Sequence, residues 1–365
     1  MASLAEILRV VGRRRLTIKR IPLADVVIIH SQGAQDFTPL LSNRKVLILD
    51  PLPVTKKISL HPVVLIRTLL NRLNGMSRET AYLASLVAQC KPKLVVTRVH
   101  NSKPFQRLDR ALPKIPFLAL QNGTLAIELD FPADQWTIHH SHFACLGQYE
   151  VDQYTRHGAS VQNFHIVGSL KVNQYLNFVK TTEQMPVYDI CLVSDYGSQD
   201  HPTQLCDYLA RYSSETGHRI SVAGRAEQTT DVEVEEKWFR NKLGDLFEFI
   251  PRPSDRFASY RAVHQSRVIV AWCSSMLREA LALQKPILAF NPTGNERYNF
   301  PVPGMWAMTN STYEEFRDRL DWLLNLDGEQ FEQTFGDLSR YLMANSSGIQ
   351  TESVLRSLID EITSG

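Results

Sequence analysis

The chain has 365 residues, of which 44% are hydrophobic and 21% are charged, and its formal net charge is +2. This composition is typical of globular proteins and excludes the disordered, fibrous and membrane-spanning classes. The small net charge also argues against polymeric nucleic acid as a partner, because such binding depends on many phosphate contacts from Lys and Arg. The length exceeds that of one hydrophobic core, so we predict two domains.

The beginning of the chain combines apolar residues with clustered cations. It lacks the apolar core and the cleavage site of a signal peptide, and the five scattered cysteines are typical of reduced thiols, so we expect a cytoplasmic protein. Two interpretations of the basic segment stay open, a peripheral contact with the inner membrane face or a solvated basic helix. Its six cations are Arg9, Arg13, Arg14, Arg15, Lys19 and Arg20.

Short β-branched segments alternate with helical patterns along the whole chain. In the first half they lie at residues 24–31, 45–50, 93–99, 116–123, 142–147 and 163–169. A polar stretch follows, and the pattern then begins again at residues 188–195, 218–225, 246–252, 267–275 and 285–292. Continuous apolar strands separated by helices predict parallel sheets that are covered on both faces.

We therefore predict an α/β protein with two Rossmann-like domains, residues 1–180 and residues 181–365. The helical segments after residue 312 contain no strand of their own. They either cover the second unit or return to the first. Ligands of such sheets bind where strands end and helices begin, so polar residues that end strands are the candidates for a functional site.

The segment VAWCSSMLREALAL places a Cys-Ser-Ser corner between a strand and a helix. The first amides of a helix are unpaired and carry partial positive charge, so Ser274 and Ser275 are candidates for binding a phosphate. Glu279 follows one turn later, where its carboxylate could accept hydrogen bonds from a ribose. The alternative is that Ser274 only caps the helix.

Three further strands of the second half end in charged residues. Arg225 follows a glycine and is a candidate for binding an anion, although surface arginines after strands are common. Arg252 lies between two prolines in a stiff loop that could cover a base or simply turn the chain. Asp195 ends the first strand and is followed by Tyr196 and a glycine. It is a candidate nucleophile or general base, with a turn-forming or helix-capping role as the alternative.

In the first half, the strand at residues 116–123 ends in Gln121, Asn122 and Gly123, where an acceptor could approach closely. His100 ends the preceding strand. Asn-Gly is also an ordinary turn signal, and a lone histidine is more often structural than catalytic.

The histidines at positions 139, 140 and 142 lack the spacing of a zinc site, and neither a Walker loop nor a GxGxxG motif is present. We therefore predict no metal site and no bound cofactor.

Several segments together carry a family resemblance. They are LALQNGT, FACLGQYEVDQYTRHG, FHIVGSLKVNQYL, ISVAGRAEQTTDVEVEEKWF and VIVAWCSSMLREALALQKPILAFNP. In this order the chain resembles bacterial surface-carbohydrate biosynthesis proteins, which look like glycosyltransferases with the two-domain GT-B fold. The resemblance implies that the second domain holds a nucleotide-sugar donor and the first receives a glycan or glycolipid acceptor, without a metal.

The resemblance further implies roles for the strand-end residues: Ser274, Ser275, Glu279, Arg225 and Arg252 on the donor, and Gln121, Asn122 and Gly123 toward the acceptor. A single phosphate on a Ser-Ser corner is similar to the site of transferases that use CMP-sugars such as CMP-Kdo. His100 departs from the acid that relatives carry there. The alternatives are a polyol-phosphate transferase of the CDP-glycerol type and an inactive GT-B scaffold.

Overall fold

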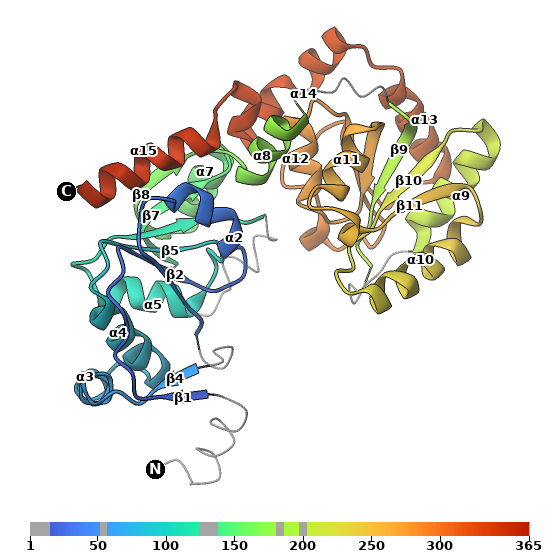
Figure 1. Ribbon diagram of the computed structural model, residues 1–365. Coiled ribbons are helices and arrows are strands. Elements are labelled where there is room, and N and C mark those ends of the chain that lie inside the picture. The colour runs from blue at the N-terminus through green and yellow to red at the C-terminus, as the bar shows by residue number, and fades with distance from the viewer. Residues whose placement is uncertain (1–14, 52–56, 124–137, 180–185, 197–202, 365) are drawn as a thin grey trace.

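The computed structural model describes residues 15–51, 57–123, 138–179, 186–196 and 203–364. The predicted basic cluster up to Arg14 and the predicted boundary at 180/181 lie outside these residues. The described part contains two six-stranded sheets, one in each half of the chain, and every strand pair in them is parallel. Figure 1 shows the two halves as separate lobes. They confirm the predicted class of two Rossmann-like domains.

The sheet of the first half has the order β3-β2-β5-β6-β7-β8. Its β2, β5 and β6 strands are buried along their whole length, which explains why their sequences are continuously apolar instead of alternating. The strands are β2 (Val26–Ile29), β3 (Val46–Leu49), β5 (Leu94–Thr97), β6 (Phe117–Leu120), β7 (His139–Cys145) and β8 (Ser160–Ile166). The helices of this half are α2 (Ala34–Phe37), η1 (Thr38–Leu41), α3 (Pro62–Leu73), α4 (Arg78–Cys90), α5 (Lys103–Ala111) and α7 (Gln148–Arg156).

The sheet of the second half has the order β11-β10-β9-β12-β13-β14. The chain builds β9, β10 and β11 outward on one side and then returns to add β12 on the other side of β9, so the topological switch point lies between β9 and β12. The strands are β9 (Tyr188–Val193), β10 (Ile220–Ala223), β11 (Phe247–Ile250), β12 (Ser266–Ala271), β13 (Ile287–Asn291) and β14 (Ala307–Thr309).

Helices cover both faces of this second sheet and continue to the end of the chain. They are α9 (Thr203–Thr216), α10 (Thr229–Leu243), η2 (Arg252–Ser254), α11 (Ala258–His264), α12 (Met276–Ala282), η3 (Glu296–Tyr298), α13 (Tyr313–Leu324), α14 (Gly328–Leu342) and η4 (Ala344–Ser347). No described helix is both long and apolar enough to cross a bilayer.

The last helix, α15 (Thr351–Ser364), returns to the first sheet. Leu355 and Ile359 are fully buried in the same apolar cluster as Val26 and Leu94 of the first sheet. In Figure 1 this helix runs along the first lobe, although its residues directly follow those of the second. The sequence left open whether the last helices cover the second unit or return to the first, and the structure shows that α15 returns to the first. The predicted domain of residues 181–365 had included this helix.

A buried ion pair also joins the halves. Arg278 of α12 lies 2.6 Å from Glu150 of α7, and both side chains are almost completely buried. Arg278 also donates a hydrogen bond of 3.1 Å to the carbonyl of Leu342. Breaking a buried pair on one side leaves an uncompensated charge, so this contact fixes how the two halves meet.

Candidate functional site

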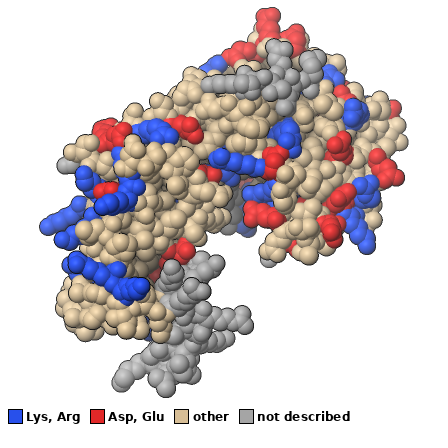
Figure 2. Space-filling model, in the orientation of Figure 1, with Lys and Arg blue, Asp and Glu red and all other residues tan. Residues whose placement is uncertain are grey.

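The carboxyl ends of the two sheets approach each other between the halves. A Cβ built on Gly123, after β6, would lie 3.6 Å from the hydroxyl oxygen of Ser275, after β12. Arg256 of the second half lies 3.7 Å from Asp36 of α2. Figure 2 shows the molecule hollowed between the lobes on this side. We call this space the crevice, and the predicted site residues are judged by their position around it.

The Ser-Ser corner directly follows β12, and helix α12 begins at Met276. The backbone N–H of Met276 donates to the Ser274 hydroxyl at 3.3 Å, so Ser274 holds the turn before the helix, whereas the N-cap residue is Ser275, whose side chain makes no capping hydrogen bond. Ser275 faces Gly123 across the crevice instead. Because α12 spans only seven residues, its dipole contributes little, and a phosphate here would depend on the hydroxyls and nearby cations. The donor contact of both serines stays a prediction.

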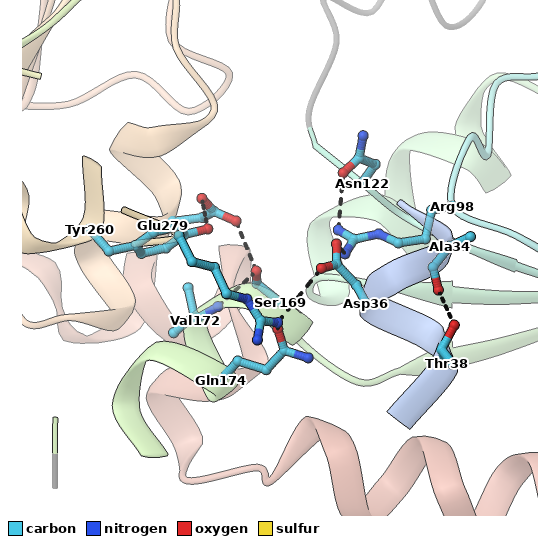
Figure 3. Close-up of polar contacts among 11 residues, drawn as sticks. Ala34, Asp36, Thr38, Arg98, Asn122, Ser169, Val172, Gln174, Tyr260 and Glu279 are labelled. Atoms are coloured by element: carbon cyan, nitrogen blue, oxygen red, sulfur yellow. Dashed lines mark hydrogen bonds and ion pairs between the residues drawn. The ribbon is translucent and has the colours of Figure 1, made fainter. Parts of the chain in front are cut away.

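Glu279 is buried and joins the two halves. Its carboxylate accepts hydrogen bonds of 2.8 Å from the Ser169 hydroxyl, which precedes helix α8 (Leu170–Val179), and of 2.8 Å from the Tyr260 hydroxyl of α11 (Figure 3). Each carboxylate oxygen can accept a second hydrogen bond. A ribose contact therefore stays a prediction, and sequence reasoning did not find the two residues that orient the carboxylate.

Asp195 follows β9, at one side of the switch point between β9 and β12. Desolvation and, to a smaller extent, the nearby Glu235 raise the pKa of its carboxyl to about 7, against the opposing effect of Arg225. An aspartic acid with a pKa near 7 exchanges protons at neutral pH, as a general base must. This environment is compatible with the predicted catalytic role, which stays a prediction.

Arg225 and Arg252 lie in adjacent loops after β10 and β11, and both side chains are exposed. Arg252 donates to the carbonyl of Arg225 at 3.4 Å and pairs with Glu227 at 3.0 Å. The buried Glu235 of α10 holds the Arg225 loop, because the amides of Arg225 and Ala226 donate to its carboxylate at 2.9 and 2.8 Å. The structure thus brings both predicted arginines to the carboxyl ends of adjacent strands of the second sheet. Glu235, which holds the Arg225 loop, was not found by sequence reasoning.

The amide residues of the first half differ in exposure. Gln121 is buried, donates to the carbonyl of Gly123 at 3.1 Å and to Glu150 at 3.2 Å, and accepts from the Leu146 amide at 3.0 Å. It therefore holds the chain at Gly123 in place. Asn122 is exposed, and its side-chain oxygen accepts from Arg98 at 3.0 Å. Contact of these residues with an acceptor stays a prediction.

His100 lies below the crevice surface, in the apolar core of the first half. Its ring stacks on Phe143 of β7 with a centroid distance of 5.8 Å, and the residue is 3% exposed. Burial and, to a smaller extent, the Arg98 guanidinium lower the pKa of His100 to about 4. Its Nδ1 accepts a hydrogen bond of 3.5 Å from the Asn122 amide, so His100 supports the backbone beside the crevice, and contact of its ring with an acceptor stays a prediction.

Cations that sequence reasoning overlooked also reach the crevice. Arg98 directly follows β5, is 3% exposed and pairs with Asp36 at 2.5 Å (Figure 3). Its position after a strand was a signal that could have identified it. Lys171 of α8 has no comparable signal, because only the fold brings its helix to the crevice.

Lys171 differs from the arginines around it. Among the described residues its ammonium has neither a hydrogen-bond nor an ion-pair partner. Burial lowers the pKa of Lys171, and the nearby Arg98 lowers it further, while Glu279 and Asp36 act in the opposite direction. A half-buried cation without a partner is available to a bound anion.

The three neighbouring histidines do not converge. His140 is fully buried, His139 lies 3.8 Å from Asp109, and His142 contacts His165 at 3.0 Å. His140 stacks on Phe143 and His142 stacks on His165 of β8, so the rings have different neighbours. Within the described ranges no group of three or more metal-ligating side chains is formed.

Comparison with solved structures shows the GT-B type of fold. The UDP-GlcNAc 2-epimerase of Neisseria meningitidis bound to UDP-GlcNAc is 14% identical over 92% of this chain and 99% of that chain, with a TM-score of 0.58. The UDP-GlcNAc 2-epimerase of Methanocaldococcus jannaschii, in complex with UDP-GlcNAc and UDP, is 11% identical over 92% and 98%, with a TM-score of 0.56. At these identities the likeness concerns the fold alone.

A third similar structure is the wall teichoic acid polymerase TagF soaked with CDPG, 11% identical over 95% of this chain and 91% of that chain, with a TM-score of 0.54. A family model described as "putative O-antigen biosynthesis protein" matches residues 198–336. This range includes the Ser-Ser corner, Glu279 and both predicted donor arginines. No curated protein sequence matches the chain.

Proposed function

We propose that the protein is a glycosyltransferase that moves a sugar from a nucleotide-activated donor to a glycan or glycolipid acceptor in surface-polysaccharide biosynthesis. The observation that carries this proposal is that Asp195 and the Ser-Ser corner follow β9 and β12, two paired strands that flank the switch point. The fold and the family match at residues 198–336 support it.

In the proposed reaction, the carboxylate of Asp195 removes the proton from an acceptor hydroxyl. The acceptor oxygen then attacks the anomeric carbon, and the bond from that carbon to the phosphate oxygen breaks, with its electron pair leaving on the phosphate. The raised pKa of Asp195 favours the base over the nucleophile, because a carboxyl with a pKa near 7 is a stronger base than an ordinary aspartate. A base gives inversion of configuration at the anomeric carbon, whereas a nucleophile gives retention.

The leaving phosphate develops negative charge, which cations in a dry crevice stabilise. Lys171 is suited to this because it has no partner among the described residues and is half-buried. The serine hydroxyls at the corner add two donors. We therefore propose that transfer does not depend on a divalent metal and that activity survives EDTA.

Two donor classes remain to be distinguished. The corner could hold the single phosphate of a CMP-sugar such as CMP-Kdo, or the diphosphate of a CDP-glycerol-type donor, for which the structural likeness to TagF is the specific observation. Melting curves with CMP, CDP, UDP, GDP and dTDP separate them, since a ligand at a hundred times its Kd adds about 2.7 kcal/mol of stability. A protein that none of them stabilises would be a scaffold.

Lys171 gives the sharpest test of the site. We expect Lys171→Met to weaken binding of the stabilising nucleotide at least tenfold and Lys171→Arg to recover part of it, because charge-assisted hydrogen bonds contribute about 1.5–3 kcal/mol. Lys285 is the matched control. It is also half-buried, burial lowers its pKa to about 8, and it lines a cavity of about 300 Å³ at the opposite edge of the second sheet.

Lys285→Met should leave nucleotide affinity unchanged. Equal losses in both lysine variants would remove Lys171 from the site. If the protein epimerised the donor sugar in the absence of an acceptor, its activity would be the one named for the two similar epimerases and not transfer.

A further inference from the structure

Helix α3 faces the protein with its less apolar side. Val64 is fully buried, and Asn71, two turns further on the same face, donates to the Ala81 carbonyl at 3.3 Å and to the Ser85 hydroxyl at 3.2 Å in α4. Thr68 lies between them. A helix of a globular protein normally buries its apolar stripe and exposes its polar one. In α3 this relation is reversed.

The outward face of α3 consists of large apolar side chains. Leu73 is 74% exposed, Leu69 61% and Ile66 59%, and Leu65 and Leu70 are exposed as well. The adjacent strand β1 (Arg15–Thr17) pairs with β4 (Lys57–Ser59), which leads into α3, and exposes Leu16 and then Ile18. Scattered exposed leucines need no explanation, but a contiguous set marks an interaction surface. We call these seven residues the α3 surface.

The charges around the α3 surface have one sign. Residues 15–24 contain three Arg or Lys and residues 57–78 contain four, and neither segment contains an Asp or Glu. Pairing of β1 with β4 brings these segments side by side. Figure 1 places α3, β1 and β4 at the end of the first lobe, and Figure 2 shows tan and blue atoms there without red on the face in view.

We infer that the α3 surface docks on an anionic lipid bilayer. Exposed leucines at helical spacing can insert at the boundary of headgroups and acyl chains, and flanking Lys and Arg are attracted to anionic headgroups. The positive charge around the α3 surface is the observation that favours an anionic bilayer over other partners. A second copy of the chain would bring two cationic rims together, and an apolar protein partner would not require a cationic rim.

This inference is independent of the donor and of the proposed transfer. It differs from attachment through the first residues alone, because it assigns insertion to the leucines of α3. These residues are exposed and make no core contacts, so their replacement should leave the fold intact.

The test measures sedimentation of the full chain with vesicles of phosphatidylcholine, with and without phosphatidylglycerol. We expect binding only to the anionic vesicles. The double variant Leu69→Gln, Leu73→Gln should lower the bound-to-free ratio at least about tenfold, since each substitution removes a large apolar side chain that the bilayer would bury. The control variant Leu246→Gln, Met305→Gln removes two exposed apolar residues of the second half and should bind as the wild type does.

A second pair of variants tests the charge. Arg67→Gln and Arg78→Gln should each weaken binding about fivefold at low salt and less at high salt. Three outcomes would overturn the inference: equal sedimentation of the leucine variant and its control, equal binding to uncharged vesicles, or a dimer that the leucine variant dissociates while vesicles bind neither form.

Discussion

The two rows of strand ends that face the crevice are built differently. After β9, β10, β11 and β12 the chain presents a half-buried acid, two exposed arginines and two hydroxyls in short loops. After β5 and β6 it presents Arg98, His100 and Gln121, all buried and mostly engaged with other protein groups. The row of the second half, here the second row, is therefore accessible to a ligand, whereas the row of the first half, the first row, mainly fixes the positions of Asn122 and Gly123.

This difference has a physical origin. Polar groups that are buried must find partners within the protein, so they are unavailable to a ligand but hold the backbone firmly. Exposed groups are solvated by water that a ligand can displace. The comparison predicts that substitutions in the first row and its supports change stability, while substitutions in the second row change binding or rate.

The largest effect is expected at the buried pair behind the first row. Arg278→Met leaves Glu150 buried without its partner and should lower the free energy of unfolding by about 3–5 kcal/mol. Urea denaturation measures this. Adding Glu150→Gln should restore part of the loss, because it removes the uncompensated charge. A loss as large in the double variant would mean that packing, not charge, dominates.

The second prediction concerns pH. The folded pKa of His100 is about 4, below the ordinary 6.5, so between these values the unfolded chain binds a proton that the folded chain does not. This contribution to stability is complete above pH 6.5 and is lost as the pH falls toward 4, by up to about 1.4 kcal/mol per pH unit. Between pH 6.5 and 4, the free energy of unfolding of His100→Phe should therefore fall less steeply than that of the wild type, by up to this amount per pH unit. Urea denaturation at several pH values measures this. If the free energies of unfolding of both proteins fell equally with pH, His100 would be excluded as a cause of the acid sensitivity.

In the second row, Asp195→Asn should reduce transfer at least roughly a hundredfold while nucleotide affinity hardly changes. In the wild type the rate should rise as the pH passes through about 7, because the base must be deprotonated to act. The variant should lose this rise. Near-normal turnover would remove Asp195 from the chemistry, and lost nucleotide binding would make it a donor-pocket residue.

The smallest effect is expected at the corner. Replacing Ser274 and Ser275 together by Ala should weaken nucleotide binding about tenfold, because hydroxyl donors to a phosphate are lost. The Ser274→Ala single variant separates the roles, since Ser274 already accepts from the Met276 amide. Calorimetry gives both affinities. If the melting temperature falls and affinity stays constant, the corner is only the start of a helix.

The sequence alone determined the two parallel sheets and most of the strand ends. Short continuous apolar runs rich in β-branched residues favour strands buried on both faces, so the number and order of these strands along the chain followed from local pattern. The three-residue β14 and the strand pair β1-β4 were not predicted, because strands this short leave hardly any pattern.

Only the tertiary structure decided which strand-end residues are exposed. Local sequence does not distinguish Arg98 from His100, yet one contacts Asn122 at the crevice and the other stacks in the core. It also does not bring Ser169 and Lys171 to Glu279, or α15 to the first sheet. These relations depend on contacts between residues far apart in the chain, and the free energy of burying them is set by the packing of whole elements, which no local pattern records.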